Sequence, residues 1–96
     1  MRAARADANQ PEIIDGLRAV GATVKTLHRV GMGCPDLLVG YGGNNYLIEV
    51  KDGSKLPSSR KLTPPQVEFF DGWRGQAGVA TCLDEALEII GVTANT

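Results

Sequence analysis

Two carboxylates and one lysine carry the clearest chemical signal in this sequence: Asp36, Glu49 and Lys51. Two carboxylates brought to within about 4 Å of each other repel by about 4 kcal/mol at an effective dielectric near 20. They therefore need a shared proton, a cation, or both. Mg²⁺ and Mn²⁺ suit such a pair, since Mg²⁺ is commonly bound by one or two carboxylates together with water and substrate phosphate. A lysine beside them would orient a water nucleophile or stabilise negative charge on a phosphate.

A predicted hairpin brings these three side chains together. Segments 35–41 and 45–51 are rich in Leu, Val, Ile and Tyr, and a Gly-Gly-Asn turn signal separates them. A two-residue glycine turn sets Asp36 directly opposite Glu49, and the lysine two residues further along projects from the same face. Shifting the turn by one residue on both sides places Asp36 opposite the lysine instead. In either register the three groups share one face of the sheet.

An ordinary cluster of salt bridges is the alternative for the same residues, with Lys51 bridging Asp36 and Glu49. Their position argues against it, because Glu49 interrupts the run Tyr46-Leu47-Ile48 and Val50. That run is typical of a central strand covered on both faces, where a charge without a metal or a partner is unfavourable.

The residues around the cluster resemble a known family. Pro35-Asp36, twelve intervening residues and Glu49-Val50-Lys51 are similar to the signature of the PD-(D/E)XK nuclease superfamily. Segments 30–38 and 61–66, which read VGMGCPDLL and KLTPPQ, resemble the short stand-alone VRR-NUC proteins of bacteria and their viruses. The resemblance extends from Asp7 to about Gly91. It implies an α/β (α+β) fold with a restriction-endonuclease-like αβββαβα core, in which helices flank a small mixed sheet.

The resemblance also implies an activity, a cofactor and a partner. The expected protein is a Mg²⁺- or Mn²⁺-dependent deoxyribonuclease in which Asp36, Glu49 and the backbone carbonyl of Val50 bind the metal. Lys51 would position water or stabilise the pentacovalent phosphate. Similarity to Holliday junction resolvases implies a homodimer that cuts branched DNA such as four-way junctions. A non-catalytic DNA-binding or assembly module, and a restriction-type nuclease, are the alternatives.

Two further residues are expected to support the site, and each has an alternative explanation. Gln66 follows Thr63 by three residues, so it either completes a helix capping box or points at the metal site, and the two are compatible. Glu12 matches the acidic residue that related nucleases carry on their first helix. An ordinary surface glutamate explains Glu12 nearly as well, and Asn9 is a weaker candidate with helix capping as its alternative.

The net charge of −1 gives no overall basic field. Basic residues instead concentrate in the middle third of the chain, where they would follow a phosphate backbone beside the carboxylates. The candidates for DNA contact are Arg29, Lys55, Arg60 and Lys61, for which a solvated polar loop is the alternative explanation.

The remaining elements follow from periodicity and from helix and turn signals. A first helix begins between Asp7 and Pro11, ends before Gly21, and directs Ile13, Ile14, Leu17 and Val20 inward. Segment 23–27 is a strand, 51–62 an irregular loop, 78–82 a last strand and 84–90 a last helix. A second helix starts after Thr63 and carries Val67, Phe69, Phe70 and Trp73.

We expect residues 1–96 to form a single domain with a core from about 7 to 91, since 43% of the chain is hydrophobic. Cys34 and Cys82 lack metal-ligand spacing, which predicts reduced thiols and a cytoplasmic protein. The sequence contains no run of about 20 apolar residues and no signal-peptide pattern, so no membrane association is expected.

Overall fold

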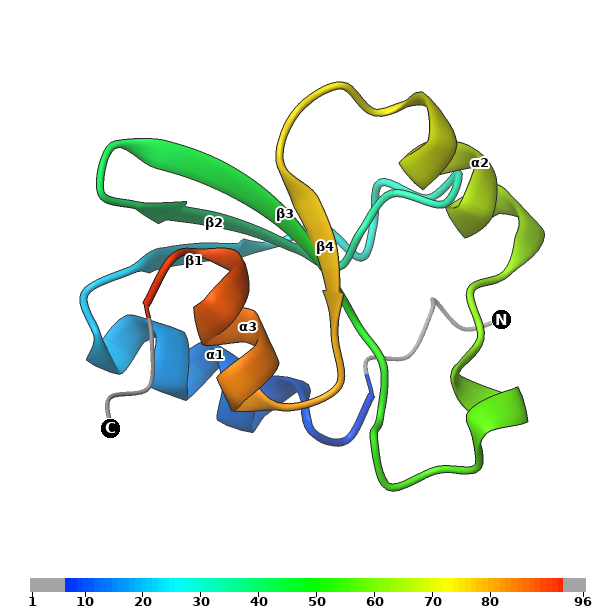
Figure 1. Ribbon diagram of the computed structural model, residues 1–96, viewed down its shortest axis with the longest axis horizontal. Helices are drawn as coiled ribbons and strands as arrows, with labels where there is room; N and C mark the ends of the chain where they lie inside the picture. The colour runs from blue at the N-terminus through cyan, green and yellow to red at the C-terminus, as the bar shows by residue number, and fades with distance from the viewer. Residues whose placement is uncertain (1–6, 93–96) are drawn as a thin grey trace.

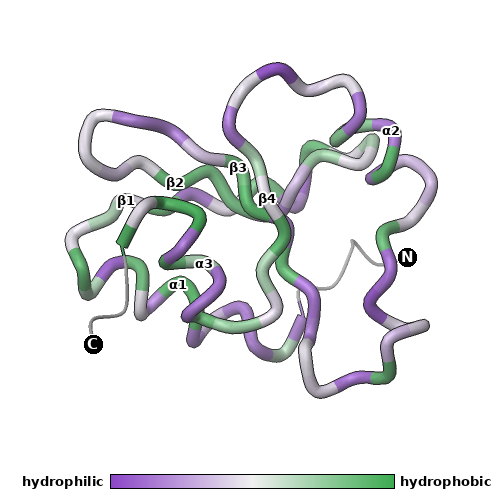
Figure 2. The backbone as a smooth tube through the Cα atoms, in the orientation of Figure 1, coloured by the Kyte–Doolittle hydropathy of each residue, from purple (hydrophilic) through white to green (hydrophobic). Residues whose placement is uncertain are grey.

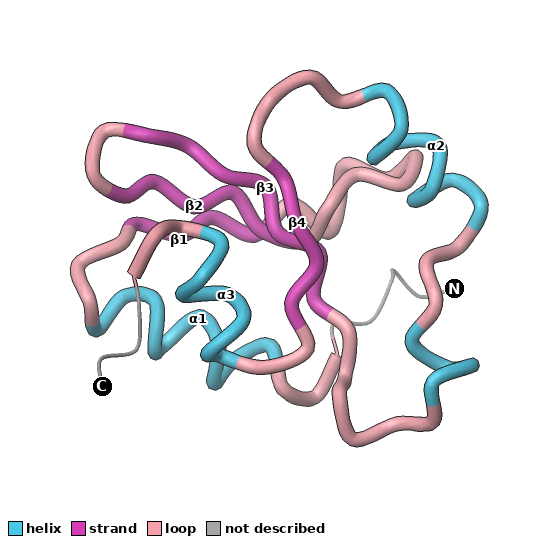
Figure 3. The backbone as a smooth tube through the Cα atoms, viewed as in Figure 1, coloured by secondary structure: helices cyan, strands magenta, loops and turns pink. Residues whose placement is uncertain are grey.

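The computed structural model describes residues 7–92 and arranges them as helix, three strands, helix, strand and helix (Figure 1). This order confirms the predicted αβββαβα core. The elements are α1 (Gln10–Ala19), β1 (Thr23–Thr26), β2 (Leu37–Tyr41), β3 (Asn44–Val50), α2 (Pro64–Gly72), β4 (Ala77–Ala80) and α3 (Leu83–Ile89). The segment between β3 and α2 is a loop that contains one 3-10 turn at Pro57–Arg60 (Figure 3).

The four strands form one mixed sheet in the order β1-β2-β3-β4. Strands β1 and β2 pair antiparallel, as do β2 and β3, whereas β4 lies parallel to β3. Gly42 and Gly43 form the turn of the central hairpin with φ angles of 60° and 84°, so that Tyr41 pairs with Asn44. Glycine adopts such angles without the steric penalty of a side chain. The predicted register is therefore confirmed.

Helices α1 and α3 cover one face of the sheet, and this inner face carries the hydrophobic core (Figure 1). Figure 2 shows hydrophobic residues concentrated along β3 and β4 near the middle of the molecule. The largest fully buried side chains in this core are Ile13, Leu17, Leu37, Val39, Ile48, Val50 and Ile90.

The opposite, outer face of the sheet is covered only in part. Side chains alternate along a strand, so Leu38 of β2 and Leu47 and Glu49 of β3 point away from α1 and α3. Val79 of β4 shares this face, because it lies in register with Glu49. Helix α2 stands apart from the other two helices and approaches only one end of the outer face (Figure 1).

The structure corrects several details of the sequence interpretation. Val20 is 37% exposed rather than inward, because α1 ends at Ala19 and Val20 lies in the turn before Gly21. Strand β2 begins at Leu37, two residues later than predicted, since Pro35 lacks an N–H for a ladder hydrogen bond. Strand β3 begins and ends one residue earlier than predicted. Strand β4 and helix α3 likewise start one residue earlier than predicted.

No helix in the range 7–92 is long and apolar enough to cross a membrane.

Candidate active site

Asp36 and Glu49 meet at the end of the central hairpin. The last paired residues of the ladder are Leu37 and Ile48, so Asp36 lies opposite Glu49 one step further along. Asp36 does not continue the ladder with its own N–H. Its Oδ2 accepts a hydrogen bond of 2.8 Å from the backbone N–H of Val50, which fixes the carboxylate at the end of β3.

Glu49 is almost fully buried, with 3% of the residue exposed. Its Oε2 accepts a hydrogen bond of 3.1 Å from Gln66 Nε2 and lies 3.6 Å from Lys51 Nζ. Its Oε1 is buried and has no hydrogen-bond partner among the described residues. A buried carboxylate oxygen without a partner is unfavourable, so this atom requires a proton or a cation.

Gln66 connects the cluster to the start of α2. Its Oε1 accepts hydrogen bonds from Lys51 Nζ and from the backbone N–H of Thr63, each at 2.9 Å. Its backbone N–H donates to Thr63 Oγ1, which completes the predicted capping box. One glutamine thus caps a helix and positions both Glu49 and Lys51, so the two explanations derived from the sequence hold together. A role for Gln66 in catalysis stays a prediction.

The surroundings of Glu49 favour its protonated form. Burial is the largest cause of the raised pKa. The negative charge of Asp36 and a hydrogen bond from protonated Glu49 to Asp36 raise the pKa further, while the charge and hydrogen bond of Lys51 lower it. Together they raise the pKa of Glu49 from 4.5 to about 8. This carboxyl group is therefore uncharged near neutral pH until a cation replaces its proton.

The residues present fit a hard divalent cation. Two carboxylates match the oxygen ligands that Mg²⁺ and Mn²⁺ prefer, and one of their oxygens has no hydrogen-bond partner in the described part of the chain. Water and phosphate complete such shells. The predicted contribution of the Val50 carbonyl stays a prediction. Histidine and cysteine do not complete a softer site, because residues 7–92 contain no group of three or more His, Cys, Asp or Glu side chains arranged to hold a metal.

The raised pKa of Glu49 predicts a pH-dependent stability for the metal-free protein. Between about pH 4.5 and about pH 8 the unfolded state has released the proton that folded Glu49 retains. The free energy of unfolding is therefore expected to fall as pH rises through this window, by up to about 1.4 kcal/mol per pH unit. Urea unfolding at several pH values in the presence of a chelator measures this slope.

The matched control for this prediction is Glu49→Gln, which keeps the shape of the side chain but does not titrate. Its pH slope should be flatter over the same window, and added Mg²⁺ should stabilise the natural protein more at pH 8 than at pH 5.5. Equal pH slopes in the two proteins would contradict the assignment of the raised pKa to Glu49.

A hollow of about 240 Å³ opens beside Asp36 and Gln66. The loop before β2 forms one wall, and the first turn of α2 forms the other. His28 and Cys34 line this hollow, and the sequence analysis gave neither a role there. Burial and the charges of Glu49 and Asp36 raise the pKa of Cys34, so its thiol stays protonated. The pairing of segment 23–27 with the hairpin was the signal that would have placed His28 here, since Leu27 N–H donates to the Asp36 carbonyl.

The glycine-rich loop makes its close approach to the protein itself. Gly33 has a φ of 78°, and a Cβ at this position would overlap the carbonyl oxygen of Pro65 in the first turn of α2. From the sequence alone, a glycine-rich turn before Asp36 is compatible with a close approach to phosphate or with a plain flexible turn. The structure instead places Gly33 against the turn that carries Gln66.

Gly33→Ala is therefore expected to disturb the active site, with Gly31→Ala as its matched control. Gly31 has the same φ of 78°, but a Cβ there would meet no atom of the described residues within 4 Å. Both changes should lower the free energy of unfolding by about 1 kcal/mol through backbone strain. Gly33→Ala should cost a further ~1–3 kcal/mol or displace α2 and with it Gln66. Equal stability and equal activity of the two variants would contradict this role of Gly33.

The first helix supplies an anchor, but it does not bring Glu12 into the cluster. Glu12 is exposed and lines a separate hollow of about 400 Å³ with Asp52 and Ser54. Asn9 does not cap α1 with its side chain. Its Nδ2 instead donates to the carbonyls of Lys51 and Thr81, at 3.1 and 3.0 Å. Asn9 therefore ties together the ends of β3 and β4 behind the candidate site.

The four predicted DNA-contact residues lie in two loops. Arg29 is exposed in the loop that forms one wall of the active-site hollow. Lys55 lies 3.8 Å from Asp7, and Arg60 Nε donates to the Lys55 carbonyl at 2.9 Å. Lys61 is exposed just before α2. Two of these side chains thus have partners within the protein, and their contact with DNA stays a prediction.

A comparison with solved structures finds a similar chain described as a VRR_NUC domain. The two share 26% sequence identity with a TM-score of 0.63, over 84% of this chain and 88% of the other. A scan against protein-family models and a search of curated proteins found no match. The chain therefore has the fold of a VRR_NUC domain, which confirms the fold class expected from the sequence.

Proposed function

We propose that this protein is a metal-dependent endonuclease that hydrolyses phosphodiester bonds in DNA, as a VRR-NUC member of the PD-(D/E)XK superfamily. The observation that carries the proposal is the Asp36, Glu49 and Lys51 cluster, in which one buried Glu49 oxygen has no hydrogen-bond partner within residues 7–92. The likeness of this protein's fold to a chain described as a VRR_NUC domain supports a nuclease-type function, because that name denotes a nuclease.

In this mechanism Asp36 and Glu49 would hold Mg²⁺ or Mn²⁺, with the Val50 carbonyl as a further ligand. A bound divalent cation lowers the pKa of a coordinated water and neutralises charge on a phosphate. Lys51 Nζ is held 2.9 Å from Gln66 Oε1, so its ammonium group is fixed beside the carboxylates. There it would orient the attacking water or stabilise the negative charge that develops on the phosphate.

DNA would approach the site across the outer face of the sheet and the two loops beside it. Lys25 on β1 and Arg29 in the following loop are exposed at one side of the cluster. Lys55, Arg60 and Lys61 lie in the segment between β3 and α2. Positive charges in the segments that precede and follow the hairpin would suit a phosphate backbone that passes the carboxylate pair.

We propose further that the protein works as a homodimer. Val67 and Phe70 are three residues apart and form one edge of α2, where Val67 is 44% exposed. A two-fold contact along this edge would bury it against its own copy and arrange two active sites symmetrically. A four-way junction has matching two-fold symmetry, which makes branched DNA the expected substrate.

The expected result is cleavage of DNA that requires Mg²⁺ or Mn²⁺ and is faster on a four-way junction than on linear duplex. Flapped and linear DNAs of the same sequence serve as controls, and light scattering gives the oligomeric state. Val67→Glu should weaken the dimer and the paired cuts, while Val20→Glu in the turn after α1 should not.

The same assay separates the alternatives. If the protein binds DNA but does not cleave it with either Mg²⁺ or Mn²⁺, the result would favour the non-catalytic module over the enzyme. Equal cutting of junction and linear duplex would remove the junction preference. A monomer both with and without DNA would remove the dimer.

A further inference from the structure

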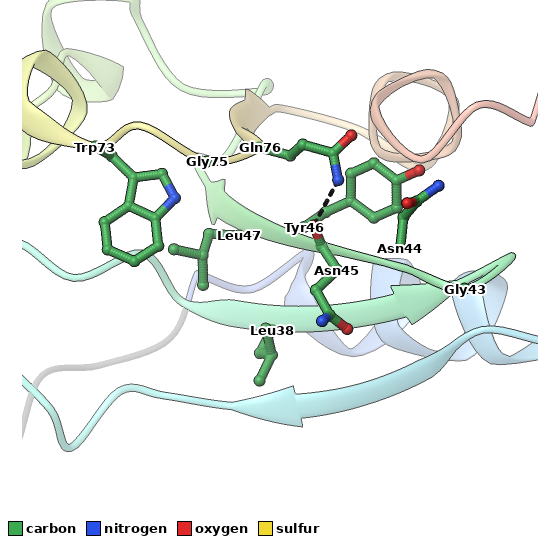
Figure 4. A pocket seen from close by; sticks show the side chains of 9 residues that line it. All are labelled: Leu38, Gly43, Asn44, Asn45, Tyr46, Leu47, Trp73, Gly75 and Gln76. Atoms are coloured by element: carbon green, nitrogen blue, oxygen red, sulfur yellow. Dashed lines mark hydrogen bonds between the residues drawn. The ribbon is translucent and has the colours of Figure 1, made fainter.

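One hollow lies on the outer face of the sheet, beyond the candidate active site (Figure 4). Its volume is about 510 Å³. Figure 4 shows Leu47 of β3 and Leu38 of β2 beneath it, with Trp73 beside Leu47. Asn45 and Gln76 lie at its other end. The hollow thus has an apolar floor, an aromatic side and an amide rim.

Trp73 is held in place although it is 45% exposed. Its indole stacks on the ring of Phe69, with ring centroids 5.1 Å apart and planes 17° from parallel. Gly75 leaves room for the indole, because a Cβ there would lie 2.8 Å from Trp73 Nε1. An aromatic ring fixed by stacking on one side offers a platform for a second planar ring at little entropic cost.

The amide rim provides unused hydrogen-bonding groups. Gln76 Nε2 donates to the Asn45 carbonyl at 2.8 Å, which orients the Gln76 side chain over the sheet (Figure 4). Within residues 7–92 no hydrogen bond uses Gln76 Oε1 or the side-chain amide of Asn45. Asn and Gln amides each present a donor and an acceptor, which is the pattern that the edge of a nucleobase requires.

The distance to the active site suits a neighbouring nucleotide. Leu47 precedes Glu49 by two residues on the same face of β3, which corresponds to about 7 Å along the strand. Bases stack at about 3.4 Å per nucleotide, so a base in the hollow would belong to a nucleotide about two steps from the phosphate at Glu49. The DNA backbone could therefore connect the two sites without additional nucleotides between them.

Charge on this face also favours an anionic ligand. Outside the Asp36, Glu49 and Lys51 cluster, the charged side chain that the strands direct to the outer face is Lys25, which lies in register with Leu38. Within residues 7–92, no strand residue that lines the hollow is acidic. A nucleotide phosphate would find a positive partner here, whereas a second copy of this chain would have to bury the amide rim.

We infer that this hollow binds one unpaired nucleobase of the DNA substrate, stacked on Trp73 with its edge toward Asn45 and Gln76. This inference rests on the proposed nuclease function and specifies its substrate as DNA with an unstacked nucleotide near the cut. Extruding a base from a duplex is unfavourable, and least so where the base is already unpaired. A branch point supplies such a nucleotide, so the hollow gives a physical reason for selecting branched DNA.

Trp73 is the one tryptophan in the sequence and reports directly on the hollow. Titration with a short oligodeoxythymidylate, without divalent cation so that no cleavage occurs, should quench its fluorescence. An abasic strand of the same length and charge should bind at least about tenfold more weakly, because stacking of one base on an aromatic ring is lost. Equal quenching by the two strands would overturn the inference.

Variants extend the test by anisotropy of labelled DNA. Trp73→Ala should reduce the preference for the normal strand over the abasic strand by about tenfold or more, and Trp73→Phe should retain most of it. Leu38→Glu places a charge on the floor of the hollow without altering the core, so it tests the inference even if Trp73→Ala fails to fold. Val20→Ala in the turn after α1 is the control, expected to bind both strands as the natural protein does.

The outcomes distinguish this inference from the proposed function. An unchanged strand preference in both Trp73→Ala and Leu38→Glu would exclude a nucleobase site, whether or not the natural protein cleaves DNA. Quenching that depends on protein concentration in the absence of DNA would assign the hollow to a second copy of the chain instead. If the natural protein prefers the normal strand over the abasic strand but does not cleave DNA with Mg²⁺ or Mn²⁺, the proposed enzyme is refuted and the nucleobase site is not.

Discussion

Asp36→Asn and Glu49→Gln are each expected to reduce the rate of DNA cleavage by about a thousandfold or more. Each change removes one charged oxygen ligand from the proposed metal site, where a bound cation contributes several kcal/mol of transition-state stabilisation. Every 1.4 kcal/mol corresponds to about a tenfold change in rate. Steady-state cleavage of a labelled junction at saturating Mg²⁺ measures the loss.

The fold should survive both substitutions, which separates a chemical role from a structural one. Asp36 accepts a hydrogen bond from the Val50 N–H, and an Asn oxygen can replace that acceptor. Glu49→Gln removes the repulsion with Asp36, so the metal-free variant should be as stable as the natural protein at pH 8, or more stable. Undiminished cleavage by either variant, in a preparation free of host nucleases, would refute the assignment.

The local part of this architecture could be read from the sequence. The Gly42-Gly43 turn fixed the register of the hairpin, and strand alternation then placed Asp36, Glu49 and Lys51 on one face. The capping box at Thr63 and Gln66 was equally local, since both partners lie within one helical turn. Such predictions succeed because a few adjacent residues determine the geometry.

Contacts between distant segments could not be read in the same way. Asn9 reaches the ends of β3 and β4, and Gly33 packs against Pro65, although each pair is far apart in sequence. A helix-capping asparagine and a flexible glycine turn are the local explanations for these residues, and tertiary packing replaced both. The hollow beside Trp73 likewise depends on how α2 sits over the sheet, which no spacing in the sequence encodes.

Replacing Lys51 or Gln66 should also slow DNA cleavage strongly. The two replacements should differ in their effects on metal binding and on stability. Lys51→Ala is expected to lower the rate of cleavage by about a hundred- to a thousandfold, because it removes a charge positioned for the transition state. Metal binding should persist, since both carboxylates remain and a positive neighbour has been removed. Calorimetric titration with Mn²⁺ beside the cleavage assay tests both halves.

Gln66→Ala should produce a smaller loss with a different signature. The substitution releases Glu49 Oε2 and Lys51 Nζ from their hydrogen bonds and also opens the capping box of α2. The expected result is a fall in stability of about 1 kcal/mol together with weaker metal binding and slower cleavage. Thr63→Ala breaks the cap but leaves the Gln66 side chain able to reach Glu49 and Lys51, so it should lose stability with little loss of activity.

If Thr63→Ala and Gln66→Ala lose activity equally, Gln66 acts only by capping the helix. If Lys51→Ala fails to bind Mn²⁺, the lysine organises the carboxylates instead of acting on the phosphate, because only an organising role would require it before substrate arrives.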